Sequence, residues 1–562
     1  MPLTLLALPL EILHYICNSL TDHADVSNFR LACRTLSSVG LDNLAPTVSF
    51  AVLPESLDRL KAIAAHPVLR HHVYTVICLT DVLPYYESFE SWKNHARESN
   101  FYLGWVVQAD DEWARESDIL AQARHQISDA KLQEGWQAYL SNLAAQEKAL
   151  QSLDDPQELI DVFKGLTHLK NLEIKGSDSD GESLSTQISE KLFDSCLVRP
   201  SPTLARPFFP FGSNGYFGSH TAKLLASLLA AASAVHREII SLRVDTLDCC
   251  FFGDGGPKAE CFAQVLNNLR HLKLDLVVEG LEDNFTSWDK ARLALSSDHL
   301  QNFLCSALGL EVLDIQFASD FYEPFIGNTA KMFPTESIWR SLRSLDLEGI
   351  SFTPSSFLGF LGCHSKTLRH LYLAHCDLAA AQEPNFPVIA PAGEDQSSPR
   401  LLWSDFFIPL SGMFSLVSFY ISGLFTVNRR LDPESLDYIR PADGVQNIGL
   451  TVGKVLEILI CSEPFNAFLR RKVEGSQNID ADTIKAHMIQ DLVDNVPSQP
   501  SNLRAQKARG YSDLRVAEKS ITVGPDMNDL RIYQHPNYLD GKTRYIEEFD
   551  YYSIGLILLE AY

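Results

Sequence analysis

Long apolar segments are missing from this 562-residue chain. No run of about 18 or more apolar residues occurs, and the stretch from Leu224 to Val235 is too short to span a bilayer. The first residues also lack the basic region of a secretory signal, and Glu11 stands early in their apolar run. We therefore expect no membrane segment and a reducing cytoplasmic or nuclear location.

Motifs for metal binding and catalysis are missing as well. The 11 cysteines are scattered without a Cys-x-x-Cys pair, so neither a metal site nor a disulfide framework is expected. There is no Gly-x-Ser-x-Gly turn, no His-Glu-x-x-His pair and no Walker loop. The sequence therefore predicts a protein with no cofactor and no enzymatic activity of its own.

Positive charge is scarce relative to negative charge. The chain has 47 Lys and Arg against 71 Asp and Glu, a formal net charge of −24. Phosphate-rich surfaces would repel such a protein, so neither nucleic acid nor an anionic membrane is expected as a partner. A hydrophobic content of 46% and a charged content of 21% are typical of soluble globular proteins. The length predicts two or three structural units.

The first 45 residues carry the clearest pattern. Four apolar residues recur at intervals of four and form one helical stripe: Leu8, Ile12, Ile16 and Leu20. Pro9 suits the first position of this helix, and Glu11 suits the positive end of its dipole. Asp25 is a candidate N-cap of a second helix, and Leu41 and Leu44 indicate a third. Because three short helices bury little core, a partner is expected to cover part of their apolar surface.

This pattern resembles the F-box. The family pattern of Leu-Pro-x-Glu-Ile, an Ile, a Leu and Arg-Leu-x-Cys-Arg reads here as Leu8-Pro9, Glu11-Ile12, Ile16, Leu20 and Arg30-Leu31-Ala32-Cys33-Arg34. The Trp often found after the Cys-Arg pair is replaced by Thr35-Leu36. The alternative interpretation is an ordinary helical hairpin. The resemblance implies docking on a Skp-type adaptor, and through it on a cullin, by Leu8, Pro9, Glu11, Ile12, Ile16, Leu20, Leu31, Cys33 and Arg34.

Residues 46–158 are predicted to form a leading repeat-like segment that holds a helical insertion. Residues 47–53 and 73–79 have the composition of strands, and residues 56–65 have helical periodicity. One face of this helix carries its apolar residues, Leu57, Leu60 and Ala64. Residues 85–153 combine four tryptophans with many charges, which predicts two or three long amphipathic helices.

Residues 159–430 repeat a leucine pattern. Leu368 to Leu378 fits the leucine-rich template L-x-x-L-x-L-x-x-[NC]-x-L at every specified position. Further copies begin at Ile239 and Leu342, and shorter ones at Leu169, Leu269, Leu310 and Leu416. Because each short strand needs a neighbour to bury its leucines, these copies predict a stacked solenoid. The alternative is an ordinary α/β domain with unrelated strands. This region resembles the irregular leucine-rich regions of fungal F-box proteins. Loops are predicted within it at about 176–220 and 382–400.

Alternation along the strands would aim the residues between the leucines at the concave surface of such a solenoid. These residues between the leucines, among them Glu173, have mixed charges and include two tyrosines, which suits a protein or peptide ligand. The predicted substrate contacts are Arg243, Lys273, Asp314, Asp346, Tyr372 and Tyr420.

Residues 431–562 are predicted to be a mostly helical C-terminal extension. Within about 510–562, the run Asp550, Ser553 and Gly555, followed by apolar residues 556–559, resembles the helix that follows the activation segment of protein kinases. The Gly-rich loop, Val-Ala-x-Lys, His-Arg-Asp and Asp-Phe-Gly motifs are absent from the sequence, so phosphoryl transfer is not expected. The tail is therefore interpreted as a truncated kinase-like fragment or a gene-model fusion, with an unrelated helix as the alternative.

Together these patterns predict an α/β protein with an N-terminal three-helix F-box, an irregular leucine-rich-repeat-like solenoid and a C-terminal extension. The function they predict is that of a substrate-recognition subunit of a cullin-type, SCF-like ubiquitin ligase. Its partners would be a Skp-type adaptor and a protein substrate that the sequence does not identify. The alternatives are a non-catalytic leucine-rich scaffold and a kinase- or pseudokinase-related protein.

Overall fold

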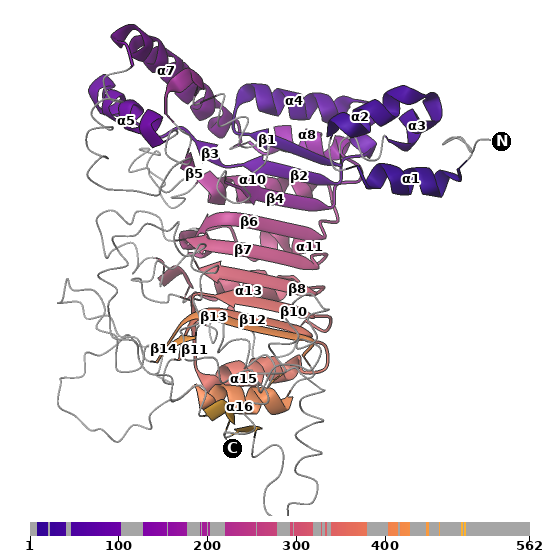
Figure 1. The fold of residues 1–562 in the computed structure, drawn as a ribbon, viewed down its shortest axis with the longest axis vertical. Helices are drawn as coiled ribbons and strands as arrows, with labels where there is room; N and C mark the ends of the chain where they lie inside the picture. The colour runs from indigo at the N-terminus through magenta and orange to yellow at the C-terminus, as the bar shows by residue number, and fades with distance from the viewer. Residues whose placement is uncertain are drawn as a thin grey trace, which may run out of the picture. The chain divides into compact units, whose positions relative to one another are not determined.

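Figure 1 shows the structure, a computed structural model. The chain divides into two compact units, Met1–Leu310 and Glu311–Tyr562. The boundary between them falls within residues 159–430. The residues that the structure describes are 8–20, 23–40, 46–102, 127–153, 155–176, 192, 194–198, 201–202, 220–253, 256–277, 291, 293–295, 297–317, 327–328, 332–333, 339–378, 403–413, 416–427, 446–448, 460, 485–486 and 488–490.

The first unit begins with three short helices, α1 (Leu10–Asn18), α2 (His23–Ala32) and α3 (Arg34–Val39). Their shared core consists of Leu13, Cys17, Val26, Leu36 and Val39. Two local predictions were wrong. Pro9 is the N-cap rather than the first helical residue, because its ψ of 151° is not helical. Asp25 lies inside the first turn of α2, which begins two residues earlier. The third helix ends at Val39, and residues 41–45, where it was predicted, lie outside the described part.

A parallel sheet follows in the first unit, made of β1 (Thr47–Ala51), β2 (Thr75–Leu79), β4 (Asn171–Lys175), β6 (Ser241–Asp248) and β7 (His271–Val277). These strands pair in chain order and lie side by side (Figure 1). Their register aligns the buried residues Val48, Val76, Leu172, Leu242 and Leu272 in one row. Each strand therefore buries its apolar face as part of one continuous layer.

Helices connect these strands and cover their apolar face. They are α4 (Pro54–Ala65), α8 (Gln157–Gly165), α10 (His220–Ala234) and α11 (Ala263–Leu266), and a further helix, α13 (Asp298–Ser306), follows β7. Helix α4 packs on β1 and α8, and α10 packs on β6 and α8. The prediction for α4 is confirmed, since the helix buries Leu57, Leu60 and Ala64. Such strand–helix alternation is what a parallel sheet requires.

The predicted helical insertion contains α5 (Phe89–Tyr102) and α7 (Asp129–Ser152), which pack on each other. Residues 103–126, including Trp105 and Trp113, lie outside the described part. Two short strands accompany the insertion: β3 (Asp81–Val82) pairs antiparallel with β5 (Ser201–Pro202). Strand β5 falls in a segment that was predicted to be a loop.

In the second unit, the strands β8 (Val312–Phe317), β10 (Ser344–Glu348), β12 (His370–Leu378) and β13 (Ser418–Val427) pair in parallel in that order. Their buried residues Leu313, Leu345, Leu371 and Phe419 are again in register. Strand β11 (Ile350–Phe352) pairs with β12 and with β9 (Gly327–Asn328), and β14 (Gln446–Ile448) adds antiparallel to β13. Helices α15 (Pro354–Cys363) and α16 (Ser404–Met413) pack on each other.

The same backbone bend recurs within β6, between β10 and β11, and within β12. Two residues after the third apolar residue of the leucine pattern, φ is positive: 56° at Thr246, 68° at Gly349 and 48° at His375. In β6 and β12 the bend coincides with a shift in strand register. The leucine pattern and a left-handed residue thus occur together at all three places, and at Thr246 and His375 the left-handed region is costly because these residues carry a Cβ.

The fold class is thus confirmed as α/β with a mostly parallel sheet, and every segment predicted as a strand forms one. Most of the predicted loops 176–220 and 382–400 lie outside the described residues. So does the kinase-like segment 510–562, and of the extension 431–562 only nine residues are described, among them β14.

Candidate functional site

The three N-terminal helices expose a group of apolar side chains. Leu10 is 53% exposed, Ile12 45%, Tyr15 72% and Leu31 83%. The cause lies in α1 itself, because Leu13 and Cys17 turn one face into the core while Ile12 and Tyr15 lie on the other. We call Leu10, Ile12, Tyr15 and Leu31 the apolar surface. Ile12 and Tyr15 lie three residues apart on α1, and Leu31 belongs to α2, so a partner that covered them would bury apolar area that these helices leave exposed.

The predicted adaptor contacts divide between this surface and the core beneath it. Pro9, Glu11, Ile12, Leu31 and Arg34 are exposed. The other four, Leu8, Ile16, Leu20 and Cys33, are half-buried, and all but Ile16 pack against the helical core. Leu8 and Leu20 of the predicted stripe therefore help to pack the three helices, whereas Ile12 is exposed.

Sequence reasoning missed two members of the apolar surface, Leu10 and Tyr15. The three-residue spacing from Ile12 to Tyr15 could have indicated the tyrosine. No comparable signal indicates Leu10, which adjoins Pro9 in sequence and lies outside the four-residue stripe.

A second candidate surface is the polar face of the sheet in the first unit. Glu173, Arg243 and Lys273 lie in register on neighbouring strands. Each nevertheless pairs two residues along its own strand: Glu173 with Lys175 at 2.8 Å, Arg243 with Asp245 at 3.0 Å, and Lys273 with Asp275 at 3.6 Å. The predicted contacts Arg243 and Lys273 are therefore adjacent, and their charges are offset locally.

The polar face of the second unit has a different character. Asp314, Asp346, Tyr372 and Tyr420 lie in one row, as predicted. The rings of Tyr372 and Tyr420 stack with centroids 4.9 Å apart and planes 6° from parallel. Gln316 Nε2 donates a hydrogen bond of 3.1 Å to Asp314 Oδ1. This face combines carboxylates with an aromatic pair, which suits recognition rather than catalysis.

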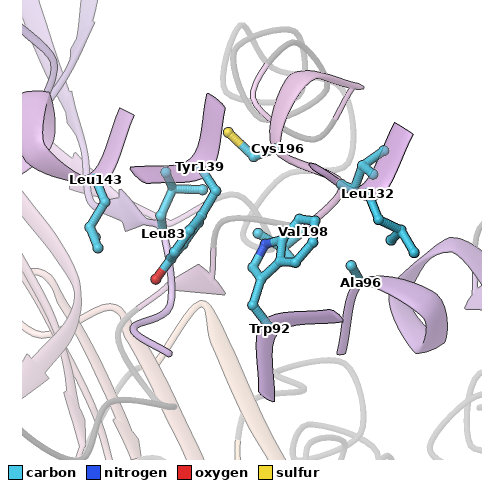
Figure 2. Packing of buried hydrophobic residues seen from close by; sticks show 9 residues of the cluster. Leu83, Trp92, Ala96, Leu132, Tyr139, Leu143, Cys196 and Val198 are labelled. Atoms are coloured by element: carbon cyan, nitrogen blue, oxygen red, sulfur yellow. The ribbon is translucent and has the colours of Figure 1, made fainter. Parts of the chain in front are cut away.

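The helical insertion has its own core, centred on Trp92 and Tyr139, both fully buried (Figure 2). The Tyr139 hydroxyl donates to Pro84 O at 2.8 Å and accepts from Tyr86 N at 3.1 Å. The buried Gln146 amide accepts from Leu83 N and donates to Asp81 O. These hydrogen bonds join α7 to the segment that follows β2, so the insertion packs as part of the folded protein.

Several buried cysteines and histidines of the described residues have shifted pKa values. Burial raises the pKa of the Cys249 and Cys376 thiols, which disfavours the reactive thiolate. Burial lowers the pKa of His364 and His375. In this part of the chain no three His, Cys, Asp or Glu side chains are grouped to hold a metal ion.

Comparison with known proteins gives no family and no relative. No family model matches the chain. A search of curated proteins finds no match either. Among the described helices, none has both the length and the apolar character needed to cross a bilayer.

Proposed function

We propose that this protein is the substrate-recognition subunit of a cullin-type ubiquitin ligase. The three N-terminal helices bind a Skp-type adaptor, and the strands of a leucine-rich-repeat-like region bind a protein substrate. The observation that carries the proposal is the apolar surface of Leu10, Ile12, Tyr15 and Leu31, at residues whose pattern resembles the F-box.

The energetics of this surface favour a permanent or tightly held partner. Fully burying one large apolar side chain contributes about 1.5–3 kcal/mol. Leu31 and Tyr15 are 83% and 72% exposed, so most of that gain is still available at both residues. Tyrosine is also one of the residue types that are enriched at the hot spots of protein interfaces.

The strands that follow the N-terminal helices would bind the substrate. These parallel strands repeat one geometry and present a face of polar and aromatic side chains that a protein substrate could contact. In this function the chain performs no chemistry, since it positions a substrate for the ubiquitin-transferring partners. The proposed location is the cytoplasm or nucleus, where those partners act.

Capture of a recombinant Skp-type adaptor by the full chain tests the proposal. The triple variant Ile12→Ala/Tyr15→Ala/Leu31→Ala removes three exposed side chains, so the fold should persist while affinity falls. At about 1 kcal/mol or more for each residue, the expected loss is about 100-fold or greater.

A matched control uses exposed leucines elsewhere in the first unit. Leu140, Leu293 and Leu308 are 40%, 64% and 54% exposed, and their triple alanine variant should capture the adaptor as the wild type does. Failure of the wild type to capture the adaptor, or equal loss in both triple variants, would refute the proposal.

Two alternatives are separated by further measurements. A leucine-rich scaffold would bind the adaptor without promoting ubiquitin transfer in a reconstituted ligase with cullin. A kinase- or pseudokinase-related protein would be stabilised against heating by ATP and magnesium, which the proposed function does not require.

A further inference from the structure

The segments that lead into β2, β4, β6 and β7 share one edge of the sheet in the first unit. These strands pair in parallel, and the backbone hydrogen bonds continue before their first residues: Lys170 N donates to Tyr74 O, and Ile240 N donates to Lys170 O. The four segments are therefore neighbours in space. We define the strand-start edge as residues 66–74, 166–170, 236–240 and 267–270.

The strand-start edge is basic although the chain as a whole has a net charge of −24. Its one acidic residue is Glu238, and its four basic residues are Arg70, Lys170, Arg237 and Arg270. Arg237 donates to Phe163 O and Lys164 O, so it offsets the negative end of α8. Lys170 Nζ lies 2.9 Å from Glu238 Oε2. An excess of positive charge therefore remains at this edge.

The guanidinium of Arg70 is held in place by neutral groups. Its Nε donates to His71 Nε2 at 3.1 Å. This bond needs an unprotonated Nε2, so the imidazole proton is on His71 Nδ1, which donates to Thr167 Oγ1 at 2.9 Å. Among the described residues no carboxylate pairs with Arg70. Its terminal nitrogens are thus positioned for the bidentate geometry in which Arg binds a carboxylate.

Rings extend the surface away from Arg70. The His168 ring centroid lies 6.2 Å from that of His71 and 5.9 Å from that of Tyr74. Tyr74 is 38% exposed, and Val68, two residues before Arg70, is 40% exposed. Tyr and Arg are residue types that protein interfaces favour. A peptide whose carboxylate reaches Arg70 would therefore also find apolar and aromatic surface beside it.

We propose that the strand-start edge, centred on Arg70, Tyr74, His168 and Lys170, binds an acidic segment of a partner protein. Charge complementarity selects the occupant, because this edge carries four cations against one anion in an otherwise acidic chain. Nucleic acid fits less well, since it is bound by rows of cations that contact successive phosphates, and here Arg237 is engaged by backbone carbonyls. The surface is distinct from the apolar surface and goes beyond the proposed function.

Anisotropy of rhodamine-labelled hepta-glutamate mixed with the full chain tests the inference. The salt concentration is about 0.15 M, where a Debye length of about 8 Å screens distant acidic residues of the chain. Arg70→Gln/Lys170→Gln should weaken binding about tenfold, or about 1.4 kcal/mol, because the peptide loses the guanidinium and a second cation. Arg70→Lys keeps the charge without the planar fork and should weaken binding about threefold.

A charge-matched control separates this edge from the general effect of charge. Lys131→Gln/Lys148→Gln removes two positive charges from exposed positions of α7, and it should change affinity less than about twofold. Equal weakening by the two double variants, or no binding by the wild type, would overturn the inference.

Two further measurements complete the test. Rhodamine-labelled hepta-thymidylate is the parallel probe, and tighter binding of it than of hepta-glutamate would assign the edge to nucleic acid and overturn the inference. Thermal melting is followed on the same samples. If Arg70→Gln/Lys170→Gln melts early, Arg70→Lys alone replaces it, and unchanged affinity for hepta-glutamate then counts against the inference.

Discussion

The bend at Thr246 is the sharpest test of the repeated strand geometry. Thr246 is β-branched and holds a φ of 56°, a region that costs a residue with a Cβ about 1–2 kcal/mol. Its Oγ1 is buried and has no hydrogen-bond partner among the described residues, so removal of the hydroxyl should not destabilise the fold. Comparison of Thr246→Gly with Thr246→Ala therefore isolates the conformational cost of the Cβ.

The expected magnitude follows from two opposing terms. Glycine removes the left-handed penalty of about 1–2 kcal/mol, and it restores about 0.5–1 kcal/mol of backbone entropy to the unfolded chain. The glycine variant should therefore be the more stable of the two by about 0.5–1 kcal/mol. At Thr75, which is not among the residues with positive φ, the order should reverse and alanine should win by about 0.5–1 kcal/mol.

Thermal melting by circular dichroism and urea unfolding measure the four variants. A difference of 1 kcal/mol shifts the melting temperature by about 2–4 °C in a unit of this size. If glycine is less stable than alanine at Thr246 by the same amount as at Thr75, the argument from backbone strain is refuted.

Three further predictions concern the insertion, the histidines and the cysteines. Gln146→Met should destabilise the first unit by about 2–4 kcal/mol in urea, because Leu83 N and Asp81 O lose their buried partner, whereas Met at the exposed Gln151 should be nearly neutral. Burial lowers the pKa of His375, so below about pH 6.5 the unfolded chain binds a proton more readily than the folded protein does. The free energy of unfolding should therefore decrease as the pH is lowered. His375→Asn, which tolerates positive φ, should flatten that decline in melting temperature, whereas Asn at the exposed His271 should leave it unchanged. Brief iodoacetamide treatment followed by mass spectrometry should modify the exposed Cys261 and Cys363 first and spare Cys78, Cys249 and Cys376, and early labelling of the buried three would contradict their packing.

Strand and helix positions were predictable where periodicity is dictated by burial. The apolar pairs Leu172/Ile174 and Leu345/Leu347 had to face a core, and all four side chains are buried. Helix α4 likewise follows from the spacing of its apolar residues and from Pro54 at its start. These features depend on local sequence alone.

Other features depend on contacts that the sequence does not specify. The strand register places Glu173 beside Arg243, yet each of them also forms an ion pair with a residue of its own strand. Side-chain rotamers, which the sequence does not specify, decide these pairs. Positive φ is easy to anticipate at Gly349 but not at Thr246 or His375, where the surrounding sheet imposes it.

The apolar surface shows the same limit. A four-residue period predicts a stripe through Ile12 but cannot decide which neighbours are taken by the core. The second and third helices make that choice, since they cover Leu13 and Cys17 and leave Tyr15 to the solvent.

Hydrogen–deuterium exchange of the full chain, with and without a Skp-type adaptor, tests the central claim most directly. The account predicts slower exchange in Leu10–Asn18 and His23–Ala32 on binding, with the strands of both units unchanged. Protection confined to the strands, or no complex at all, would contradict the claim that the exposed apolar helices are the adaptor-binding site.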